Sequence, residues 1–139
     1  MDGRVNVRVV TRNRIGGEEE TLRFAGEGVL RRARAAGSCT TMRERDGRDG
    51  DGVSVRLTDE PIHIALRSGA CLLYLDPETQ TQARLLEGEQ DSTPMTVTTR
   101  EAVWRLDAPD GGQIIMHYLL TLGGAPVSDL HVSLYLTKR

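Results

Sequence analysis

The stretch Ile62–Asp76, IHIALRSGACLLYLD, decides the fold class because it has the pattern of two strands joined by a tight turn. In its first half aliphatic side chains alternate with small or polar ones, and a period of two places them on one face of a strand. The aliphatic set is Ile62, Ile64 and Leu66. In its second half apolar side chains occupy both faces, which is typical of a strand covered on both sides. The pattern predicts a hairpin with its turn at Ser68-Gly69, at the centre of the fold.

Alternating segments separated by turn signals continue on both sides of this hairpin. Residues 4–15 alternate strictly at first and stop at Gly16-Gly17, a pair typical of a two-residue hairpin turn. In the return segment, residues 30–36 could also form a short helical turn, but Gly26 and Gly28 interrupt a helix and predict a bulge or bend within a strand. Residues 46–52, DGRDGDG, predict a loop. The remaining predicted strands are residues 38–45, 53–60, 95–109 in one uninterrupted alternation, 113–122 after a turn at 110–112, and 127–139 after a turn at 123–126.

No segment shows a sustained helical stripe of apolar residues, and no longer repeat is present. We therefore predict an all-β protein with one domain over residues 1–139. Short turns between consecutive strands favour a single antiparallel meander. We expect it to close into a calycin- or lipocalin-like β-barrel of about eight to ten strands, because closure removes exposed sheet edges. A sandwich would bury the same faces and is the alternative.

Composition points to a cytoplasmic protein. The N-terminal MDGRVNVRVV lacks the apolar core of a signal peptide, and Cys39 and Cys71 have neither a CxxC spacing nor the density of a disulfide scaffold. No apolar run approaches the roughly 20 residues of a membrane-spanning helix, so we expect no membrane role. A formal net charge of -2 without an aromatic-interleaved basic patch argues against nucleic acid as a partner.

Several short pieces together resemble a known family. They are Arg67-Ser68-Gly69-Ala70, the Thr93-Pro94 break before a threonine-rich strand, and the closing pair GGQIIMHYLLTLGG (111–124) and DLHVSLYL (129–136). In order and spacing they resemble the DUF1934 family of small bacterial YwiB-like proteins, over residues 5–136. The resemblance implies a calycin-like β-barrel fold and implies no particular activity.

The three histidines, His63, His117 and His131, are the natural candidates for a metal site, and they share no local ligand spacing. All three fall in predicted strands, so they could converge only across neighbouring strands. The periodicity argues against that, because His117 aligns with apolar neighbours and His131 with polar ones. We therefore predict no metal site and no cofactor, and we interpret the histidines as solvated or hydrogen-bonded strand residues.

The signals for catalysis are weak as well. Ser68 beside Gly69 lacks the G-x-S-x-G frame of a nucleophile elbow, and Cys71 fits a small core residue. Cys39 lies on an arginine-flanked strand, where a lowered pKa is conceivable. The loop at residues 46–52 does not match the calcium-loop pattern. We predict no catalytic residues, and an enzyme of unknown reaction is kept as a second alternative only.

A binding cavity is the stronger functional hypothesis, because small barrels either fill their interior or hold one small ligand. The candidate ligand-binding residues are Arg67, whose guanidinium suits an anionic group, and Trp104 and Tyr118, whose flat surfaces each carry a polar handle. We expect a small, anionic or amphipathic ligand inside the barrel. The first alternative is a protein-interaction or homodimerising module, because residues 70–76 and 113–122 are apolar on both faces.

Overall fold

The computed structural model describes residues 3–33, 37–44, 53–59, 62–68, 71–85, 95–106 and 111–138. Every regular element in these ranges is a β-strand, which confirms the all-β prediction. The first six strands are β1 (Gly3–Ile15), β2 (Glu18–Ala33), β3 (Gly37–Glu44), β4 (Val53–Asp59), β5 (Ile62–Ser68) and β6 (Cys71–Leu75). The others are β7 (Thr81–Gln82), β8 (Arg84–Leu85), β9 (Thr96–Arg105), β10 (Gly111–Leu122) and β11 (Ala125–Lys138).

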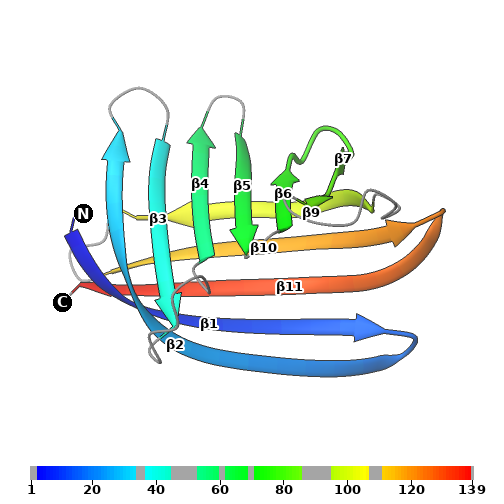
Figure 1. Cartoon of the computed structure of the whole chain (residues 1–139), viewed down its shortest axis with the longest axis horizontal. Helices are drawn as coiled ribbons and strands as arrows, with labels where there is room; N and C mark the ends of the chain where they lie inside the picture. Colours follow the sequence, from blue (N-terminus) through cyan, green and yellow to red (C-terminus); the bar gives the residue numbers. More distant parts are fainter. Residues whose placement is uncertain are drawn as a thin grey trace.

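The strands follow one hydrogen-bonded order, β7-β9-β10-β11-β1-β2-β3-β4-β5-β6-β8, with antiparallel neighbours. β2 belongs to two sheets, because its residues 18–30 pair with β1 and its residues 26–33 pair with β3. Figure 1 shows β2 bending, so that β9, β10, β11, β1 and the start of β2 form a long sheet crossed by a short sheet of β3–β6. Gly26 and Gly28 lie in the overlap without a register shift, so the predicted irregularity is a bend.

The predicted closed barrel is wrong, because the two ends of the strand order do not pair within the described residues. Closure would require β6 to pair with β9, but β6 crosses β9 steeply, which prevents a regular ladder (Figure 1). The two-residue β7 lies between them. Thr81 pairs with Val97 of β9, and its hydroxyl donates a hydrogen bond to the Tyr74 carbonyl of β6. The fold is therefore two antiparallel sheets packed face to face.

The hairpin of β5 and β6 forms with Ile64 opposite Leu75 and Ser68 opposite Cys71. Ser68, predicted in the turn, therefore belongs to β5 instead. Ile64 and Leu66 of the hairpin's aliphatic face are buried, as the alternation predicted. Its predicted central position is wrong, because β6 is followed only by the short β8 at one end of the order. The predicted cover on both faces of β6 is also wrong, since Tyr74 is 40% exposed while Leu75 is fully buried.

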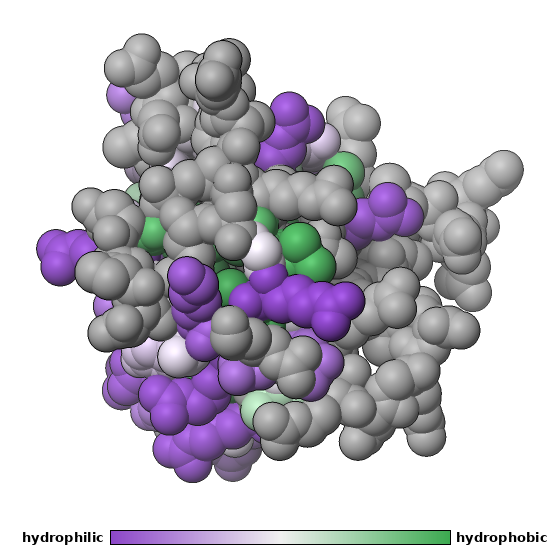
Figure 2. Space-filling model, turned by 90° about the vertical axis from the view of Figure 1, so that its left-hand side faces the viewer, coloured by the Kyte–Doolittle hydropathy of each residue, from purple (hydrophilic) through white to green (hydrophobic). Residues whose placement is uncertain are grey.

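The hydrophobic core lies between the two sheets and receives side chains from both. Its largest fully buried members are Leu30, Leu57, Ile64, Leu75, Ile114, Met116, Leu134, Val5, Val7, Val55 and Val97. Figure 2, a view onto one end of the molecule, shows hydrophobic residues mainly in the middle of this face, with hydrophilic residues beside them. Aliphatic packing of this kind supplies most of the free energy that stabilises a small β-protein.

Glycines fix the ends of the strands that matter for the site. Gly123 and Gly124 have φ of 59° and 82°, the left-handed conformation of a two-residue hairpin turn. Gly111, predicted in a turn, instead begins β10. A Cβ on Gly111 would lie 2.2 Å from the backbone oxygen of Leu136, so the close approach of β11 requires glycine there.

Candidate metal-binding site

A β-bulge in the β10–β11 hairpin determines which side chains face each other. The pairing runs from Leu122 opposite Ala125 to Thr121 opposite Pro126, and it then shifts by one residue. Val127 is the extra residue, and Pro126 beside it lacks the N–H that a regular ladder needs. Beyond the bulge the two strands continue in the shifted register.

This shift places His117 of β10 directly opposite His131 of β11. Without the bulge, the two-residue turn would place Leu130 opposite His117 and would turn His131 to the other face of the sheet. The sequence-based argument that periodicity separates the two histidines is therefore wrong. His63 is not part of the pair, because its backbone lies on β5, opposite Thr58 of β4.

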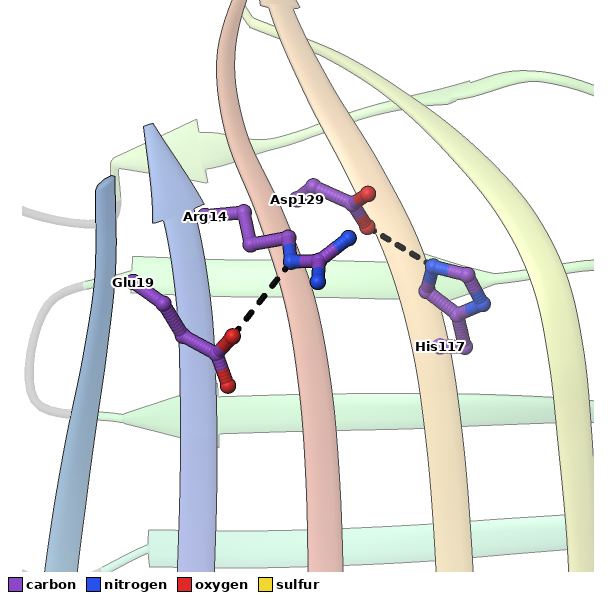
Figure 3. A network of polar contacts seen from close by, with 4 residues as sticks. All are labelled: Arg14, Glu19, His117 and Asp129. Atoms are coloured by element: carbon purple, nitrogen blue, oxygen red, sulfur yellow. Dashed lines mark hydrogen bonds and ion pairs between the residues drawn. The ribbon is translucent and has the colours of Figure 1, made fainter. Parts of the chain in front are cut away.

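We call His117, Asp129 and His131 the His–Asp cluster. The two imidazole rings stack with centroids 3.6 Å apart and an interplanar angle of 22°. Asp129 precedes His131 by two residues and so shares its face, and its Oδ1 lies 2.7 Å from Nε2 of His117 (Figure 3). One ligand atom from each residue lies within 4.8 Å of the others. The side chains of His117 and Asp129 are 22% and 34% exposed, so solvent reaches the cluster.

The cluster lies on the outer face of the long sheet, opposite the core. The neighbouring residues of β10 and β11 that point inward, Met116 and Val132, are buried. On the β1 side, Arg12 is opposite His131 and Arg14 is opposite Asp129. A mixed row of charged and imidazole side chains therefore crosses the face.

A second bulge completes this row on the β9 side. Glu101 is opposite His117, whereas Thr99 is opposite Tyr118, so Arg100 is the extra residue. Bulges are frequent beside functional sites because they re-aim side chains. Here one bulge on each strand flanking β10 aligns a carboxylate and two imidazoles.

The environment of His131 favours its neutral form. Its pKa is lowered, first by burial of the ring and then by His117. The Asp129 carboxylate opposes this shift by raising the pKa, and the guanidiniums of Arg12 and Arg14 lower it. A neutral imidazole offers the lone pair that a metal ion needs. The cluster thus presents two nitrogen donors and one carboxylate oxygen.

These donors suit a transition-metal dication. Zinc binds imidazole nitrogen and carboxylate oxygen at about 2.0–2.2 Å, so tetrahedral ligand atoms lie roughly 3.4 Å apart. Rotation of partly exposed side chains can reduce the 4.8 Å spread to that separation. A purely structural role is the competing interpretation, in which the stacked pair and the carboxylate stabilise the hairpin by the roughly 0.2–1 kcal/mol of a cross-strand pair.

The residues predicted to bind a ligand do not converge. Arg67 is exposed on β5, on the face opposite to the buried Ile64. Trp104 is partly buried and packs against the core from β9, and Tyr118 is buried on β10 with an exposed fraction of 4%. Tyr118 and Trp104 point between the sheets, whereas Arg67 points away from them.

Other sequence candidates fall outside what the structure describes. The loop at residues 46–52 lies outside the described residues, as do the side chains of Cys39, His63, Ser68 and Cys71. The signal that could have found the cluster is Pro126, which follows the turn and marks a break in the ladder. If the strands are paired outward from the turn at Gly123-Gly124 and one extra residue is allowed after Pro126, His117 falls opposite His131.

Comparisons with known proteins support the fold. No family model and no curated protein matches the chain. Among solved structures, the crystal structure of ywiB protein from Bacillus subtilis is similar, with a TM-score of 0.76 and 15% sequence identity. The match covers 99% of this chain and 93% of that one. At this identity the likeness shows a YwiB-like all-β fold. No helix among the described residues could cross a membrane.

Proposed function

We propose that this protein is a metal-binding module whose His–Asp cluster holds one transition-metal dication, with Zn²⁺ the best fit. The observation that carries the proposal is that two neighbouring strands place two imidazoles and a carboxylate within 4.8 Å of one another. Nitrogen donors favour zinc over magnesium and calcium, which prefer all-oxygen sites.

The positions of the donors support a built site. His117 lies on β10 and both His131 and Asp129 lie on β11, two inner strands of the long sheet that pair along most of their length. Donors on paired strands need little ordering when the metal binds, because the backbone is already fixed. Only side-chain rotation remains.

The hydrogen bond from His117 to Asp129 competes with metal binding. It is 2.7 Å long and partly exposed, so its net contribution is modest, about 1 kcal/mol or less. A metal bond to both groups more than replaces it, because the apparent free energy of structural zinc binding reaches about 10 kcal/mol or more. Three protein donors on an open face should give weaker binding than such closed sites.

Isothermal titration of the metal-free protein with ZnCl₂ tests the proposal. We expect one zinc per chain, and we expect His117→Gln and His131→Gln each to weaken binding by at least tenfold. His63→Gln is the matched control, because it removes the third histidine of the chain from another sheet. Equal weakening by all three substitutions, or no saturable binding, would contradict the proposal.

A small ligand between the sheets is the second candidate. The hydroxyl of Thr99 is buried and has no hydrogen-bond partner among the described residues, and Thr99 lies opposite Tyr118 on the inner face. A buried polar atom without a partner costs about 1–3 kcal/mol, so a ligand or water that binds it would be stabilised. Native mass spectrometry of protein purified from its own cells would detect a retained small molecule as an added mass.

We also propose that the chain belongs to the DUF1934 family, on the short motifs and the YwiB-like fold together, and that it acts in the cytoplasm. A homodimer is a further proposal, supported by Val103 and Leu122, which are 48% and 40% exposed. Light scattering across a range of concentrations tests the dimer, and cell fractionation tests the location.

A further inference from the structure

We propose that the metal-loaded His–Asp cluster binds a phosphate-class oxyanion, which occupies the open coordination position of the metal and pairs with the guanidinium of Arg12. The inference rests on the proposed function, because it needs the metal in place. It adds the chemical class of the ligand that the site would take.

An open coordination position follows from the number of protein donors. The cluster supplies three ligand atoms, whereas zinc is commonly four-coordinate. Sites with three protein ligands keep the fourth position for water or an exogenous ligand. Because the cluster lies on an exposed face, an anion from solution can reach this position without any movement of the backbone.

Arg12 is placed to hold the other side of that anion. It lies on β1 directly opposite His131, on the same outer face, and its side chain is exposed. It makes no hydrogen bond or ion pair with another residue in the described ranges. A guanidinium without a carboxylate partner can donate two parallel N–H hydrogen bonds to an oxyanion.

Arg14 offers the anion a second guanidinium. Figure 3 shows its side chain reaching from β1 toward Asp129 and His117. Its contact with Glu19 is 3.5 Å long between two exposed side chains, a pair that contributes little and can be released. A second guanidinium therefore lies within reach of the anion.

Local charge makes anion binding depend on the metal. Without a metal, the carboxylates of Asp129, Glu101 and Glu19 offset the guanidiniums of Arg12 and Arg14, so the site attracts an anion only weakly. A bound dication adds two positive charges and makes the site more attractive to an anion. Metal and anion should therefore increase each other's affinity by the same factor, as linkage requires.

The experiment measures inorganic phosphate binding by calorimetry to the full chain with and without Co²⁺, after unbound metal has been removed. Visible absorption of the bound Co²⁺ reports whether its coordination changes. We expect phosphate to bind the Co²⁺ form at least tenfold more tightly than the metal-free form and to change the spectrum. Arg12→Gln should weaken this binding by about tenfold and leave Co²⁺ affinity within twofold.

Arg23→Gln is the matched control, because Arg23 is exposed on the same sheet but lies opposite Val10, away from the cluster. Failure of Co²⁺ and Zn²⁺ to bind would overturn the proposed metal function and this inference with it. Metal binding with equal phosphate affinity in both forms, or equal effects of the two arginine substitutions, would overturn this inference alone.

Discussion

Replacing Met116 with alanine should destabilise the protein strongly, because this side chain fills the space between the two sheets. Met116 is fully buried on β10. Truncation removes the stabilisation that comes from burying the side chain, and it leaves a cavity. Together these effects lower the free energy of unfolding by about 2–5 kcal/mol in packed cores. With a urea m-value of about 2 kcal/mol/M, the unfolding midpoint should fall by roughly 1–2.5 M.

Ile115→Ala is the matched control, since Ile115 is the next residue of β10 and points to the outer face, where it is partly buried. The substitution removes three side-chain carbons, each worth about 0.8 kcal/mol when fully buried. Because Ile115 is only partly buried, we expect the free energy of unfolding to fall by roughly 1 kcal/mol. Urea unfolding followed by tryptophan fluorescence and circular dichroism measures both variants. If Met116→Ala costs no more than Ile115→Ala, the interior around β10 is an open cavity and the account of a packed core is wrong.

Three further predictions concern the turn, the strand contact and the metal donors. Gly123→Ala should cost about 1–2 kcal/mol in urea unfolding, because alanine is strained at a φ of 59°; an unchanged midpoint would refute this. Gly111→Ala should lower the free energy of unfolding by about 1–3 kcal/mol or more, because its Cβ would overlap the backbone oxygen of Leu136. A smaller loss would show that β11 can move away from β10. Asp129→Asn should weaken zinc binding by roughly tenfold or more, as the amide keeps an acceptor for His117 but loses the charge; a change under twofold by calorimetry would show that Asp129 is not a ligand.

Features that depend on neighbouring residues, namely turn glycines and strand alternation, could be predicted from the sequence. The glycine pairs at 16–17 and 123–124 adopt left-handed conformations that only a few residues tolerate, so their hairpins could be read directly. Strict alternation likewise identified β1, β4 and β5. These features depend on neighbouring residues alone.

Closure could not be predicted, because it depends on the angle at which distant strands meet. β6 and β9 are far apart in sequence, and their steep crossing follows from the bend in β2 (Figure 1). Sheet twist and bending accumulate over many residues, and no single motif records their sum. Alternation therefore identified the apolar faces of single strands such as β1 and β5, and it left the choice between barrel and sandwich open.

The candidate site was missed because it depends on two single-residue bulges. Residues 95–109 were predicted to alternate without a break, but Arg100 is extra, so buried positions switch from Val97 and Thr99 to Ala102 and Leu106. The bulge at Val127 similarly aligns the two histidines. One inserted residue reverses the face of every residue beyond it, and strand periodicity alone does not reveal this.

A zinc titration followed by nuclear magnetic resonance through the ring signals of the three histidines tests directly whether the His–Asp cluster binds a metal ion. We predict that the signals of His117 and His131 change together and saturate at one equivalent of zinc, while the signal of His63 stays in place. Parallel changes at all three histidines, or no change before a large excess of zinc, would contradict a metal site at the His–Asp cluster.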